Sequence, residues 1–89
     1  MNKDLKQLLD NKLAVDILEF FHQNQGSIDS VGGISAWVNG DREQVKDVLD
    51  KLVQLDVLKQ DAEGITEGYC YTRDEKMMND VESFFRTRR

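Results

Sequence analysis

Four polar side chains in one short segment have the chemistry to contact a nucleic acid. They are Arg42, Gln44, Lys46 and Lys51. Arginine and glutamine can form paired hydrogen bonds with the edges of guanine and adenine, and lysine can neutralise a phosphate. The first three of these residues fall near the start of an expected helix, where base edges are usually read. This segment is therefore the first candidate for a binding surface.

The same segment carries more acidic than basic side chains. Its five acids are Asp41, Glu43, Asp47, Asp50 and Asp56. Carboxylates repel phosphate, and a charged outer face is the ordinary state of a surface helix. A solvated face with pairs such as Glu43–Asp47, which is repulsive, and Asp47–Lys51, which is attractive, is therefore favoured over nucleic-acid contact.

The charge of the whole chain agrees with that of the segment. The 89 residues carry a formal net charge of −5, and 33% of them are charged. Three of the twelve basic residues lie in the last four positions, so the rest of the chain is more acidic still. A protein that binds DNA by neutralising phosphates usually shows a basic face. DNA is therefore a partner that the charge disfavours.

Catalytic and metal chemistry have little support in the sequence. His22 is the only histidine and Cys70 the only cysteine, so no cluster has the spacing of a zinc site. We interpret His22 as a partly exposed helix residue, Cys70 as an ordinary strand cysteine and Trp37 as a core or hinge residue. The single cysteine, the lack of a membrane-length apolar run and the lack of a signal-peptide core predict a non-enzymatic cytoplasmic protein without a cofactor.

The elements that would position these residues begin with three helices. Apolar residues at spacings of three and four predict a first helix over about 4–24, either continuous or broken near Asp10-Asn11. A second helix is expected over 31–38. Asp41 would cap the third, whose apolar stripe covers 45–55. A turn joins the second and third helices, so the candidate side chains would lie just after it.

Short strands and a last helix complete the chain. Segment 27–29 suits a brief strand or an extended connection, and strands are expected from Val57 and over 68–72. Alternation places both tyrosines of the last strand on one face and Cys70 on the other. A final helix with a basic tail covers 74–89. The sequence predicts one mainly helical α+β domain over 1–89.

This order of elements resembles the winged-helix family, in particular small transcriptional regulators of the MarR and ArsR type. The middle helix and turn of the family match Ile34-Ser35-Ala36-Trp37-Val38-Asn39-Gly40-Asp41, and the helix exit matches Leu55-Asp56-Val57-Leu58. The end of the hairpin matches Tyr69-Cys70-Tyr71-Thr72, and the resemblance covers roughly Asn11 to Arg73. It implies a winged helix-turn-helix: three core helices, a small antiparallel β-wing and an additional C-terminal helix.

The resemblance also implies a function and leaves an alternative open. The helix from Arg42 would be the recognition helix of a DNA-binding transcriptional regulator. The chain departs from the family where Gly40 replaces an apolar turn residue and where Asp56 replaces a common glycine. The expected wing tip, 61–68, has three acids and no base, which is unfavourable next to phosphate. The alternative is a protein–protein interaction or adaptor module that does not bind DNA.

The terminal helices form a second candidate surface. The N-terminal helical extension covers 1–10, and the C-terminal helix covers 74–89. Their apolar residues are Leu5, Leu8, Leu9, Met77, Met78, Val81, Phe84 and Phe85. In MarR- and ArsR-like proteins the terminal helices build a two-fold dimer, so the resemblance implies a homodimer. The methionine and phenylalanine pairs, Met77-Met78 and Phe84-Phe85, also suit an adaptable groove for another protein partner. The alternative is that both helices fold back on their own domain.

Overall fold

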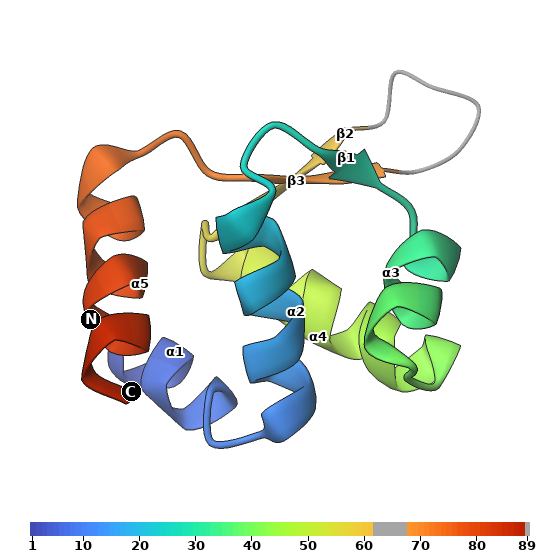
Figure 1. Ribbon diagram of the computed structural model, residues 1–89, viewed down its shortest axis with the longest axis horizontal. Helices are drawn as coiled ribbons and strands as arrows, with labels where there is room; N and C mark the ends of the chain where they lie inside the picture. Colours follow the sequence, from blue (N-terminus) through green and yellow to red (C-terminus); the bar gives the residue numbers. More distant parts are fainter. Residues whose placement is uncertain (62–67, 89) are drawn as a thin grey trace.

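The computed structural model describes residues 1–61 and 68–88, and its elements follow the predicted order (Figure 1). The helices are α1 (Lys3–Leu8), α2 (Lys12–Gln23), α3 (Val31–Val38), α4 (Arg42–Gln54) and α5 (Glu75–Arg88). The strands are β1 (Ile28–Asp29), β2 (Leu58–Asp61) and β3 (Gly68–Tyr71). The predicted fold class is confirmed: mainly helical, with a small antiparallel sheet and a C-terminal helix.

The N-terminal helical region is broken near Asp10-Asn11, which is one of the two alternatives that the sequence allows. Asn11 has an extended backbone, and its Oδ1 accepts a hydrogen bond from the Leu13 amide at 2.9 Å, so Asn11 caps α2. The preceding helix α1 has only six residues, too few to be stable in isolation. It is held in place by Leu5 and Leu9, which are buried in the core.

The turn between α3 and α4 explains one departure from the family pattern. Asn39 adopts the left-handed conformation with φ of 55°, and Asp41 Oδ2 accepts from the Gln44 amide at 3.2 Å, as its predicted capping role requires. Gly40 does not have a positive φ. Its backbone instead packs so closely that a Cβ would lie 3.1 Å from two core side chains. A larger residue would have to displace these side chains by a few tenths of an ångström, so the close approach favours glycine there.

The end of α4 explains the other departure. The amide of Val57 donates a hydrogen bond to the carbonyl of Leu52 at 2.9 Å. The amide of Asp56 donates to the carbonyl of Val53 at 3.0 Å. This pair of bonds is the Schellman arrangement, whose central residue takes the left-handed conformation. Asp56 occupies that position with φ of 62°. An aspartate therefore stands where the backbone favours glycine.

Asp56→Gly is expected to raise the free energy of unfolding by about 0.5–1 kcal/mol, because glycine carries no steric cost in the left-handed region. For a domain of this size the melting temperature should rise by a few degrees. Asp56→Ala is the matched control, because it removes the same charge and keeps a Cβ. Thermal unfolding should show stabilisation by glycine and none by alanine; equal stabilisation by both would assign the effect to charge.

The three strands form one sheet over the ends of the helices. The strand order is β1-β3-β2, with both pairs antiparallel and Leu58 opposite Tyr71. Tyr69 and Tyr71 are buried on the helix side and Cys70 is half-buried on the other face, as the alternation predicted. In Figure 1 the sheet runs along the top, with α2 in the centre and α3 and α5 on either side of it. No described helix is long and apolar enough to cross a membrane.

Candidate nucleic-acid interface

The outward face of α4 is acidic at its centre. The buried face of this helix consists of Val45, Val48, Leu49 and Leu52. Successive residues of an α-helix are rotated by about 100°. The exposed residues opposite the buried face are therefore Glu43, Asp47 and Gln54. Two carboxylates occupy the part of the helix that points most directly away from the core.

The four predicted nucleic-acid residues are divided between the two edges of this face. Arg42 and Lys46, one turn apart, lie on one edge, and Gln44 and Lys51 lie on the other. The guanidinium of Arg42 lies over Gly32 in the first turn of α3, so close that a Cβ on that glycine would overlap it. The spacing of about 100° per residue alone gives this division, so the four residues do not form a single set.

Lys46 is bound to a neighbouring acid that also connects α4 to the sheet. Its Nζ lies 3.2 Å from Asp50 Oδ2, and the hydroxyl of Tyr69 donates to Asp50 Oδ1 at 3.1 Å. The hydrogen bond with Asp50 is the main cause that raises the pKa of Lys46. Burial is the main cause that raises the pKa of Tyr69. The ion pair between residues four apart in α4 is therefore Lys46–Asp50, and the expected Asp47–Lys51 pair does not form in this helix.

The opposite edge of α4 borders the N-terminal helix. Gln44 and Lys51 line a shallow hollow together with Leu8 and Asn11. Both side chains are exposed. The hollow therefore borders the edge of α4 that is turned away from Arg42 and Lys46.

His22 joins three elements, a role that sequence reasoning missed. Its Nε2 donates to Glu82 of α5 at 2.5 Å, and its Nδ1 lies 3.1 Å from the hydroxyl of Tyr71 in β3. Its ring also stacks on Phe85, with 5.6 Å between ring centroids. The hydrogen bond from His22 lowers the pKa of Glu82. Burial, followed by the charge of Glu82, raises the pKa of Tyr71 to about 12.

The raised pKa of Tyr71 predicts a loss of stability at high pH. An unfolded tyrosine has a pKa of about 10, so the folded protein holds the neutral phenol more firmly than the unfolded chain does. Stability from this source is fully present below about pH 10 and is lost as the pH rises towards the folded pKa of about 12. Urea unfolding at a series of pH values measures the loss. Tyr71→Phe should lose less stability over that interval, and an equal loss would contradict the assignment.

The terminal helices bury much of the apolar surface that was expected to form a dimer. Four of the eight residues are buried in their own chain: Leu5, Leu9, Val81 and Phe85. The other four are half-buried against the core: Leu8, Met77, Met78 and Phe84. Helix α1 packs beside the end of α5 (Figure 1). Leu8 lines a hollow together with Lys51 of α4 and with Leu55, which caps the end of that helix. The eight residues therefore do not form one open apolar face, and the homodimer stays a prediction.

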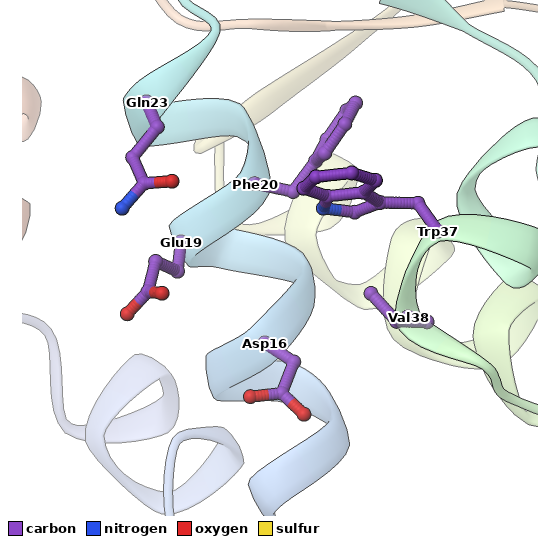
Figure 2. Close-up of a pocket in the computed structure, with 6 residues that line it drawn as sticks. All are labelled: Asp16, Glu19, Phe20, Gln23, Trp37 and Val38. Carbon is purple, nitrogen blue, oxygen red and sulfur yellow. The ribbon is translucent and has the colours of Figure 1, made fainter.

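The interpretation of Trp37 as a core residue is wrong, whereas its role as a hinge stays a prediction. Its side chain is 63% exposed. The reason is the short helix α3, whose buried face is centred on Ile34 and Ser35, so that Trp37 falls on the edge of the helix facing α2. Its ring lies 5.5 Å from that of Phe20, between centroids (Figure 2). Helix α3 has several other apolar residues, and their spacing alone does not indicate that Trp37 is the exposed one.

Comparison with known proteins decides the fold. No family model matches the chain, and no curated protein matches it. The AntR antimony-specific transcriptional repressor superimposes with a TM-score of 0.70 at 20% identity, covering 91% of this chain and 70% of that one. AF1382 from Archaeoglobus fulgidus gives a TM-score of 0.68 at 20% identity, covering 91% and 92%. The chain has a winged-helix fold.

The fold by itself does not determine what this winged-helix protein does. Human N-acetylserotonin methyltransferase in complex with SAM also contains a similar arrangement, with a TM-score of 0.53 at 20% identity. The match covers 82% of this chain and only 24% of the methyltransferase. The same scaffold therefore occurs both in a repressor and as a part of an enzyme, so function has to be argued from the surface.

In the winged-helix fold the antiparallel pair of β2 and β3 forms the wing. The acidic wing tip that the sequence predicts falls mainly on residues 62–67, which lie outside the described residues. Among the described residues, no group of three histidine, cysteine or acidic side chains could hold a metal ion.

Proposed function

We propose that this winged-helix protein is a cytoplasmic transcriptional regulator that binds DNA through α4. The observation that carries the proposal is the arrangement of charge on the outward face of that helix, with basic residues on both edges and carboxylates between them. The similarity in fold to AntR, which is by its title a transcriptional repressor, also supports it.

The charge arrangement fits a helix lying in the major groove. There the two edges of a helix face the two phosphate backbones, and its centre faces the base edges. Arg42 and Lys51, on opposite edges, are suited to phosphate contacts. Glu43 and Asp47 are suited to accept hydrogen bonds from the amino group of cytosine. An acidic centre also disfavours non-specific binding, so we expect affinity to depend strongly on sequence.

Selection from a randomised duplex library tests this proposal. We expect the wild type to enrich a sequence containing C·G pairs, because carboxylates accept from cytosine N4. The variant Glu43→Gln with Asp47→Asn keeps the size of both side chains and should select a different base at one or two positions. Failure of the wild type to enrich any sequence would contradict the proposal, as would an unchanged preference in the variant.

A second function, as a protein-interaction module, is favoured by one specific observation. Trp37 presents most of its side chain to solvent beside the carboxylates of Asp16 and Glu19. Large exposed aromatic side chains are typical of protein contacts, and nearby carboxylates repel DNA. The two functions use different surfaces, so a regulator can have both.

The homodimer belongs to the same proposal, because two-fold regulators place their recognition helices about 34 Å apart on DNA. We expect the half-buried Met77 and Phe84 of α5 to complete their burial against a second copy. Sedimentation equilibrium should find a dimer for the wild type and a monomer for Phe84→Asp. Ser83→Asp, at the neighbouring exposed position of α5, is the matched control and should remain dimeric. A monomeric wild type would contradict the dimer and would leave DNA binding by one protomer to be measured separately.

A further inference from the structure

A groove on the surface between α2 and α3 is distinct from the outward face of α4. Its lining consists of Asp16, Glu19, Phe20, Gln23, Trp37 and Val38, and we call it the α2–α3 groove (Figure 2). We propose that the α2–α3 groove binds a segment of another protein in which a lysine or arginine lies next to an apolar residue. This binding would add a protein partner to the proposed contact with DNA.

The aromatic side of the groove is preorganised for contact. Trp37 is 63% exposed, and its ring lies against Phe20 at 5.5 Å, tilted by 58°. Phe20 is held in turn by an edge-to-face contact with the buried Phe21, at 5.3 Å. Trp37 therefore rests on a side chain that is anchored in the core. A partner residue covering it would remove apolar surface from water at little cost in side-chain entropy.

The acidic side of the groove determines the charge of the partner. Asp16 and Glu19 lie along one face of α2, and none of the residues lining the groove is basic. Asp16 is paired with Lys12 at 3.1 Å. Glu19 is exposed and has no ion-pair partner among the described residues. A cationic side chain in the groove could contact the face of Trp37 and would be attracted by the two carboxylates, whereas phosphate would be repelled.

The size of the groove indicates a side chain and not a free small molecule. The hollow has a volume of about 250 Å³, which is below the roughly 300–1,000 Å³ of sites for drug-sized ligands. That volume accommodates one large side chain. The net charge of −5 also attracts a basic partner over distance.

The described arginines at the end of this chain's own α5 are already engaged, which argues against a second copy as the occupant. The guanidinium of Arg88 lies over the ring of Phe84 at 5.3 Å. Arg86 is paired with Glu82 at 3.6 Å. Placing either in the groove of another copy would first break these contacts.

Selection of displayed random peptides on the whole protein tests the proposal. We expect enriched peptides to carry lysine or arginine within four residues of an apolar residue. Trp37→Ala should weaken their binding by about 30-fold, as loss of an interface tryptophan typically does, and Glu19→Lys should also weaken it clearly. Lys3→Ala, on the exposed surface of α1, is the matched control. Both groove variants alter exposed residues, so their melting temperatures should stay close to that of the wild type.

Trp37 is the only tryptophan in the chain, so its fluorescence reports directly on the groove. A selected peptide should shift its emission to shorter wavelength with the same midpoint as binding. The proposal would be overturned by enrichment of no peptide, by peptides that bind Trp37→Ala equally well, or by peptides without a basic residue. It would also be overturned by emission that responds to random duplex DNA instead of peptide. Emission that changes with protein concentration alone, and no longer does so in Arg88→Glu, would assign the groove to a second copy.

Discussion

Replacing Phe21 by alanine is expected to lower the free energy of unfolding by about 3–5 kcal/mol. Phe21 is fully buried and is among the largest side chains in the core. It belongs to α2, which contacts α3, α4 and α5. A cavity there would remove packing from the core that α2 shares with these helices. Because a domain of this size is stabilised by only about 5–15 kcal/mol, the variant should be close to unfolding at room temperature.

Phe20 offers a control of identical chemistry at the adjacent position. It is only half-buried and lies against the exposed Trp37. Phe20→Ala should therefore cost less, about 1–2 kcal/mol, because less apolar surface loses its cover. Urea unfolding of both variants, monitored by circular dichroism, gives the comparison. If both variants lost the same free energy of unfolding, α2 would not pack with Phe21 in the core and Phe20 at its edge.

The second large effect is expected when the charge on both edges of α4 is reversed. Arg42→Glu combined with Lys51→Glu should weaken binding to a selected duplex at least 100-fold at ~50 mM salt. Each substitution removes a phosphate contact and adds a repulsive charge. The residues are exposed, so the melting temperature should change little.

A control variant with the same net charge separates the effect of charge on α4 from the effect of the total charge of the protein. Lys3 and Lys76 are exposed residues of α1 and α5. Lys3→Glu with Lys76→Glu changes the total charge by the same amount and should weaken binding only slightly, because these positions are not on α4. If both double variants lost affinity equally, overall charge and not α4 would control binding.

Features that depend on local chemistry were predicted from the sequence. A break near Asp10-Asn11 is one of two alternatives that the sequence leaves open, and the structure has the break. Asp41 caps α4, and Tyr69 and Tyr71 share one face of β3, as predicted. Each follows from a capping side chain or from alternation along a strand, and needs no knowledge of distant segments. The similarity to winged-helix proteins rests on the same local signals.

Features that depend on tertiary packing were not predicted. His22 and Glu82 are far apart in the sequence and meet only because α5 returns beside α2. Trp37 has a large apolar side chain of the kind that is usually buried, but the orientation of α3 leaves it exposed. The hydroxyl of Tyr69 in β3 donates to Asp50 in α4 and so connects this strand to the helix below it. No spacing along the chain indicates contacts of this kind.

The salt dependence of binding to a selected duplex tests the central claim most directly. If Arg42, Lys46 and Lys51 neutralise phosphates, fluorescence anisotropy should give a slope of log affinity against log salt near −2.7 per protomer, or roughly a 40-fold loss between 50 and 200 mM. The Arg42→Glu, Lys51→Glu variant should lower the magnitude of that slope by about two. Absence of binding at ~50 mM salt, or an unchanged slope in the variant, would contradict the claim that this winged-helix protein binds DNA through α4.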